Sequence, residues 1–106
     1  MRRVYIAAPY STGDVAANVR NAYEAATRLA DAGVAPFVPH HTHFWHLLFP
    51  RAYEDWLKLD LAFLPCCDAV LRLPGESPGA DTEVRKARAL GIPVFENLDL
   101  LLRDLP

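Results

Sequence analysis

The chain alternates short apolar runs with longer amphipathic segments, and this alternation constrains the fold more than any other feature. Four runs read as buried strands, and three of them end directly before a proline. They cover residues 3–8, 34–38, 68–73 and 92–95. Helical periodicity occupies residues 14–32, 51–64, 79–90 and 97–104. Strands that alternate with helices form βαβ units with parallel strands and right-handed crossovers. We therefore expect an α/β fold built on a small, doubly wound parallel sheet of about four strands.

Size and charge narrow the choice of protein class. A chain of 106 residues has room for one hydrophobic core, so we expect residues 1–106 to form a single domain. The net charge is −2, which leaves no basic excess to neutralise a nucleic-acid backbone. No apolar run approaches the roughly 18 residues that span a bilayer, and Pro9 interrupts the first one. We predict no nucleic-acid partner, no membrane partner and a cytoplasmic location.

The loops that follow the strands are the expected place for a ligand. In doubly wound sheets, ligands bind outside the carboxyl ends of the strands, where the strand order reverses. These loops are residues 9–13, 39–49 and 74–79, and we expect residues 40–50 to be a loop rich in histidine and aromatic residues.

Two acidic residues fall on helix faces that should be apolar. The apolar stripe of residues 51–64 consists of Tyr53, Trp56, Leu57, Leu61 and Leu64. Asp60 lies in the middle of this stripe, and Glu83 lies on the apolar side of the next helix beside Ala87 and Leu90. An ionised carboxylate buried without a partner costs several kcal/mol. A helix cap or an ion pair with an arginine would explain either acid alone. For both together we favour function, because a carboxylate pair is what glycosyl transfer requires.

Three segments carry a family resemblance. They are VYIAAPYS at residues 4–11, LKLDLAFLPCCDAVLRL at residues 57–73 and GESPGADTEVRKARALGIPV at residues 75–94. The chain resembles the nucleoside 2-deoxyribosyltransferase superfamily, including its short, largely uncharacterised members. It is also similar to deoxynucleoside-monophosphate N-glycosidases, because Ser77 stands where that branch places a phosphate-binding serine. The resemblance implies a flavodoxin- or Rossmann-like sheet with strand order 2-1-3-4 and helices on both faces.

The resemblance also implies roles for individual residues. Glu83 would be the nucleophile that attacks C1′ of the sugar, and Asp60 would protonate the leaving base or orient the sugar. Tyr5 would hold the nucleophile through its hydroxyl group. Residues expected to bind substrate are Ala8, Pro9, Ser11, His41, Ser77 and Gly79. The substrate would be a small nucleoside or nucleotide, and the protein would be a homo-oligomer, either a dimer or a tetramer.

All four histidines lie between His40 and His46, which suggests a metal site at first sight. His41, His43 and His46 form the alternative ligand set. No cysteine is near them, however, and the candidate acids are distant in sequence. We therefore predict no metal, with imidazoles that hydrogen-bond the backbone or a ligand. The neighbouring aromatic residues would stack on a base or belong to the core or a subunit interface. These are Phe44, Trp45, Phe49 and Trp56.

Other catalytic signatures are missing from the sequence. No GxxxxGK[ST] motif occurs, and no GxGxxG follows the first strand, so we predict no nucleotide cofactor. Ser11 and Ser77 lack the context of a nucleophile elbow. The sequence thus favours an enzyme that acts on N-glycosidic bonds. The alternatives are a non-catalytic module that binds a nucleotide or nucleotide-sugar in the same crevice, and a scaffold with a vestigial cleft.

Overall fold

A four-stranded parallel sheet organises the protein. The computed structural model describes residues 1–105, and the strand order is β2-β1-β3-β4, as predicted. The strands are β1 (Arg3–Ala7), β2 (Ala35–Phe37), β3 (Ala69–Arg72) and β4 (Val94–Phe95). In the two central strands Val4 pairs with Ala69 and Ile6 with Leu71. Each strand is slightly shorter than the apolar run that predicted it.

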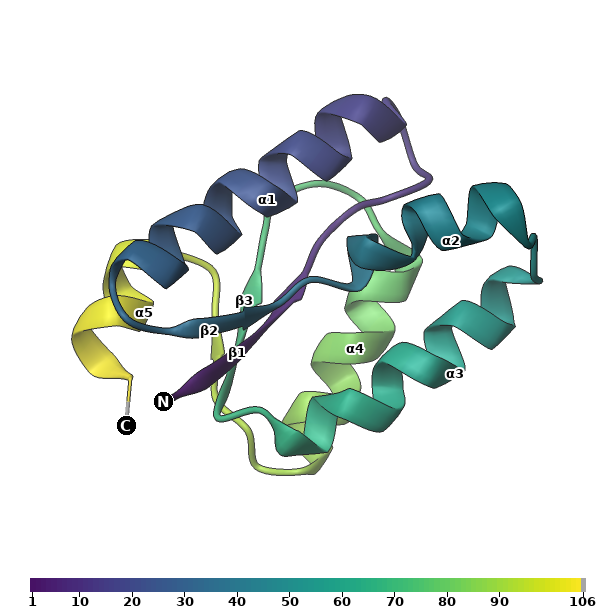
Figure 1. The fold of residues 1–106 in the computed structure, drawn as a ribbon. Coiled ribbons are helices and arrows are strands. Elements are labelled where there is room, and N and C mark those ends of the chain that lie inside the picture. Colours follow the sequence, from purple (N-terminus) through teal and green to yellow (C-terminus); the bar gives the residue numbers. More distant parts are fainter. Residues whose placement is uncertain (106) are drawn as a thin grey trace.

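Helices cover both faces of this sheet (Figure 1). The longer helices are α1 (Val15–Asp31), α3 (Tyr53–Phe63) and α4 (Pro78–Ala89), and α5 (Leu98–Asp104) closes the chain. Helices α1 and α5 pack on one face, whereas α3 and α4 lie on the other. A short 3₁₀ turn, Leu64–Cys66, joins α3 to β3. Within residues 1–105, no helix is both long enough and apolar enough to cross a membrane.

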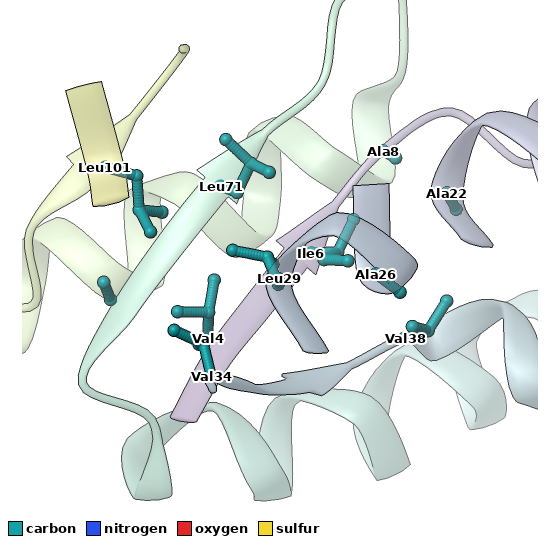
Figure 2. Close-up of a cluster of buried hydrophobic side chains, with 11 residues drawn as sticks. Val4, Ile6, Ala8, Ala22, Ala26, Leu29, Val34, Val38, Leu71 and Leu101 are labelled. Atoms are coloured by element: carbon teal, nitrogen blue, oxygen red, sulfur yellow. The ribbon is translucent and has the colours of Figure 1, made fainter. Parts of the chain in front are cut away.

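The pleat of β1 divides the buried side chains into two cores. Val4 and Ile6 point toward α1 and meet Leu29 and Leu101 in an entirely apolar cluster (Figure 2). Tyr5, the intervening residue, points to the opposite face and joins the core under α4. Successive side chains of a strand face opposite sides of the sheet, so one strand supplies both cores.

The segment predicted as a loop at residues 40–50 is largely helical. A 3₁₀ turn, Pro39–His41, leads directly into helix α2, Thr42–Leu48. None of the residues of α2 is buried, so the helix has no core-facing stripe. Sequence periodicity identifies a helix by such a stripe, and its absence explains why the prediction was wrong.

Candidate active site

A cleft of about 500 Å³ opens on the carboxyl side of the sheet, between the end of β1 and helices α2, α3 and α4. Helix α1 follows β1 on one face, whereas α4 follows β3 on the other, so the crevice lies where the chain direction reverses. The predicted residues that line it are Ala8, Ser11, Asp60, Ser77, Gly79 and Glu83. Six residues that stand far apart in the sequence therefore meet in one cavity.

Glu83 is held at the base of this cleft by Tyr5. It lies in the second turn of α4, three residues after Ala80 and four before Ala87, and is almost completely buried with them. The hydroxyl group of Tyr5, itself fully buried, donates a hydrogen bond to Oε2 of Glu83. The bond joins a central strand to the helix packed on it. It fixes the orientation of the carboxylate while leaving Oε1 free of that contact.

Asp60 reaches the same cleft from α3. It lies one helical turn from both Trp56 and Leu64, and all three are buried. The ion pairs found within residues 1–105 are Arg28–Asp99, Arg72–Asp81 and Arg103–Asp104. In that part of the chain, neither Asp60 nor Glu83 is neutralised by a cation. The explanation of the two acids as structural ion pairs is therefore not supported.

Burial keeps protons on this pair of acids. Desolvation raises the pKa of Asp60 to about 7 and that of Glu83 to about 8. For Glu83, the nearby Asp60 raises the pKa further, while the Tyr5 hydroxyl and Arg72 oppose the shift. Burial and the adjacent Glu83 raise the pKa of Tyr5 far above its usual range, so its hydroxyl remains a donor. Two carboxyl groups that interact titrate as a pair, which holds one proton between about pH 7 and 8. The Tyr5 hydrogen bond lowers the pKa of Glu83 and so favours its ionised form, although that pKa stays above the pKa of Asp60.

The first turn of α4 forms another wall of the cleft. The Ser77 side chain caps the helix by accepting a hydrogen bond from the Ala80 amide at 3.1 Å. A Cβ atom on Gly79 would lie 1.9 Å from the Tyr53 hydroxyl oxygen, so glycine is required for this close approach. Burial raises the pKa of Tyr53, with smaller contributions from Glu83 and Asp60. A phenol therefore stands over the start of α4, beside the two acids.

The histidines do not gather around a common point. The exposed His41 bonds through Nδ1 to the Tyr23 hydroxyl on α1, outside the cleft, contrary to the prediction that it lines the site. His43 pairs with Tyr10 and His46 with Trp56. Among the described residues, 1–105, no three metal-ligating side chains come together, so the alternative metal set of His41, His43 and His46 is not formed.

Pro9, which follows β1, and His40, in the 3₁₀ turn after β2, are joined by a hydrogen bond beside the cleft. The buried Pro9 lines a second, smaller cavity rather than the main cleft. Its carbonyl oxygen lies 2.8 Å from Nε2 of the buried His40, which does line the cleft. Burial lowers the pKa of His40, so the ring is neutral and donates to this carbonyl. Pro9 thus positions the cleft wall instead of contacting a ligand there.

Several cleft residues were not among those expected to bind substrate. They are Tyr10, Thr12, Pro39, His40, Thr42, His46, Arg51, Tyr53, Trp56, Leu57, Pro78 and Ala80. Of these, Trp56 was expected either to stack on a base or to belong to the core or a subunit interface. Tyr53, Trp56 and Leu57 were predicted to pack as an apolar stripe. The presence of Asp60 in that stripe was the available signal that part of it faces a ligand cavity.

The α/β fold of this chain is similar to that of solved 2-deoxyribosyltransferases. It belongs to the family described as "Domain of unknown function (DUF7768)", which it matches over residues 2–97. A 2-deoxyribosyltransferase from Bacillus psychrosaccharolyticus has a similar structure, with a TM-score of 0.62 and 21% identity over 97% of this chain and 81% of that one. A second, from Leishmania mexicana, has a TM-score of 0.63 and 18% identity over 90% of this chain and 63% of that one. No curated protein matches the chain significantly. These structures establish the shared fold.

Proposed function

We propose that this protein cleaves the N-glycosidic bond of a nucleoside or nucleotide through a covalent glycosyl intermediate on Glu83. The observation that carries this proposal is the pair of buried carboxyl groups, free of ion pairs in residues 1–105, that open on one cleft. Holding both acids there costs folding free energy, and a reaction at an anomeric carbon explains that cost. The 2-deoxyribosyltransferase activity named for the two structural neighbours supports the same reaction class.

The roles follow from the hydrogen bonds and charges of the site. Ionised Glu83 attacks C1′ and forms a C–O bond, while the bond from C1′ to the base nitrogen breaks and its electron pair leaves with the base. Asp60 supplies the proton that neutralises the leaving base. The negative charge of Glu83 stabilises the oxocarbenium-like transition state before the bond forms. A second base or a water molecule then attacks C1′, while the C1′–O bond to Glu83 breaks and its electron pair returns to the Glu83 carboxylate. Attack by a base gives transfer and attack by water gives hydrolysis, and Asp60 takes the proton that the incoming nucleophile loses.

The cleft suits a ligand of nucleoside size. Its volume of about 500 Å³ falls within the usual range of small-molecule sites. Trp56 and Leu57 provide an apolar wall for the base, while Ser11, Ser77 and Gly79 provide a polar wall for the sugar and its 5′ side. Ala8 also lines the cleft, whereas Pro9 does not.

The proposal is tested by incubating the protein with purine 2′-deoxynucleosides and a different free base. Chromatography would separate base exchange from simple base release. We expect turnover that Glu83→Gln lowers at least about a thousandfold, with a covalent sugar adduct on the Glu83 peptide detectable by mass spectrometry. Glu76→Gln is the matched control, because Glu76 is an exposed acid in the loop before α4. Tight nucleotide binding without turnover would instead identify a binding module, and neither result across a broad panel would indicate a vestigial cleft.

We also propose that a second copy of the chain covers α2. This helix and the residue after it carry the exposed apolar side chains Phe44, Trp45, Leu47, Leu48 and Phe49, which are 48–75% exposed. With an accessible area of about 200 Å² for each large side chain, they offer roughly 600 Å². Leu59 and Phe63 on α3 add to this area. The total approaches the roughly 800 Å² per partner of a stable interface, and a twofold axis lets the same surface serve both copies.

Light scattering after size-exclusion chromatography tests this assembly. We expect a dimer or tetramer at micromolar concentration, and a monomer for Leu48→Glu. Leu100→Glu is the control, since Leu100 is an exposed leucine of α5 on the opposite face of the sheet. A monomeric wild-type protein, or a Leu48→Glu variant that keeps its assembly, would contradict the proposal.

A further inference from the structure

One cleft histidine is held in a single tautomer by a tryptophan. The indole Nε1–H of Trp56 donates to Nδ1 of His46 at 2.7 Å, and the backbone N–H of Arg51 approaches the same atom at 3.3 Å. An indole nitrogen and a backbone amide can only donate, so Nδ1 must be the unprotonated nitrogen. In neutral His46 the proton therefore resides on Nε2.

The second nitrogen of this ring has no hydrogen-bond partner in the part of the chain that the structure describes. Within residues 1–105, the hydrogen bonds of the His46 side chain all involve Nδ1. The half-buried ring lines the same cleft as Asp60 and Glu83, and its edge-to-face contact with Trp56 fixes its plane. The Nε2–H group of His46 is therefore a donor of fixed orientation that is available to a ligand.

The position of this donor along α3 indicates which part of a ligand it meets. Trp56 precedes Asp60 by one helical turn, a rise of about 6 Å. In the proposed reaction Asp60 delivers its proton to the leaving base. A base seated against Asp60 and extending along α3 then has its outer edge near Trp56 and His46.

We propose that His46 recognises the leaving nucleobase by donating a hydrogen bond from Nε2 to an acceptor atom on the base, and that Trp56 is the residue that positions it. This inference rests on the proposed function for the identity of the ligand. It predicts a preference for bases that present a carbonyl oxygen or ring nitrogen at this edge. An exocyclic amine there would meet another donor and be disfavoured.

The first measurement concerns the tautomer and requires no activity. Nitrogen-15 NMR of the imidazole in the wild-type protein should show His46 protonated at Nε2. Trp56→Phe keeps an aromatic ring but removes the indole donor, so it should shift His46 toward a mixture of tautomers. A wild-type His46 protonated at Nδ1, or a tautomer that does not respond to Trp56→Phe, would overturn the positioning role.

The second measurement concerns the base. Hypoxanthine would be titrated calorimetrically into a Glu83→Gln background, and kcat/KM for 2′-deoxyinosine would be measured with Glu83 intact. We expect His46→Phe to lower both quantities roughly 10- to 100-fold. His46→Gln, which retains an N–H donor, should restore most of the loss. Equal base affinity in the wild type and His46→Phe would overturn the inference. Base binding that depends on His46 in a protein without turnover would refute the proposed reaction but leave this recognition intact.

Discussion

The two faces of the sheet share β1 but use it differently. On the α1 face, the side chains of Val4 and Ile6 enter a cluster made only of hydrocarbon. On the α4 face, Tyr5 of the same strand bonds to an acid that is as buried as the core around it. Burial of apolar side chains on the first face stabilises the folded state. Burial of polar groups on the second face lowers this stability in part. This contrast indicates that stability and chemistry are divided between the two sides of one strand.

The largest expected effect on stability lies on the α1 face. Leu29→Ala should lower the free energy of unfolding by about 2–5 kcal/mol, because Leu29 is completely buried and its removal leaves a cavity. Urea denaturation measures this loss. At a temperature low enough to keep the variant folded, its kcat should equal that of the wild-type protein. A kcat that falls in Leu29→Ala under these conditions would show that the two faces are not independent.

On the α4 face, a substitution is expected to raise the free energy of unfolding instead of lowering it. The pKa values of Asp60 and Glu83 rise from 3.8 and 4.5 to about 7 and about 8 on folding, so the native state binds more protons than the unfolded chain. The free energy of unfolding therefore falls as the pH rises from about 4 to about 8. Glu83→Gln removes this cost and should stabilise the protein by about 1–3 kcal/mol at pH 8, with little gain at pH 4. Denaturation at both pH values, with Glu76→Gln as control, would detect it. A destabilised variant at pH 8 would show that Glu83 is a structural residue.

The variant Tyr5→Phe distinguishes the contribution of the hydroxyl group from that of the aromatic ring. The ring still fills the core, so stability should change by less than about 1.5 kcal/mol. Loss of the donor raises the pKa of Glu83 further. The wild-type pH profile of kcat/KM should be bell-shaped, with its optimum between about 7 and 8. In the variant, the basic limb should move to higher pH, because the higher of the two pKa values belongs to Glu83. The maximum should fall roughly tenfold or more, because a smaller share of the singly protonated pair carries its charge on Glu83. An unchanged basic limb and an unchanged maximum would exclude Tyr5 from controlling the nucleophile.

The smallest expected change in stability comes from removing a helix cap, and the two faces each offer one. Ser77 caps α4 beside the cleft, and Asn97 caps α5 on the other face through a bond to the Leu100 amide. Replacing either by alanine should cost about 1 kcal/mol of stability. Only Ser77→Ala should also raise KM, because only Ser77 lines the cleft. Equal KM values for the two variants would remove Ser77 from the substrate site.

The sequence was a good guide to the fold and to the acids. Strand order and the inward orientation of Asp60 and Glu83 both follow from periodicity and family resemblance, since a carboxylate in an apolar stripe is visible without coordinates. Helix α2 was missed because it buries no residue. His41 was expected in the cleft, yet its neighbour His40 lies there, because a 3₁₀ turn at Pro39 sets the direction of each ring.

The pattern of apolar and polar residues in the chain determined that the protein is a parallel α/β sheet with two acids turned inward. The spacing of apolar residues in helices and strands indicates, residue by residue, which side chains are buried. Only the tertiary structure decided which side chains complete the cleft. Tyr53 over Gly79, and Trp56 against His46, depend on how α2 and α3 pack beside the sheet. Contacts between elements depend on packing in three dimensions, and no local period encodes them.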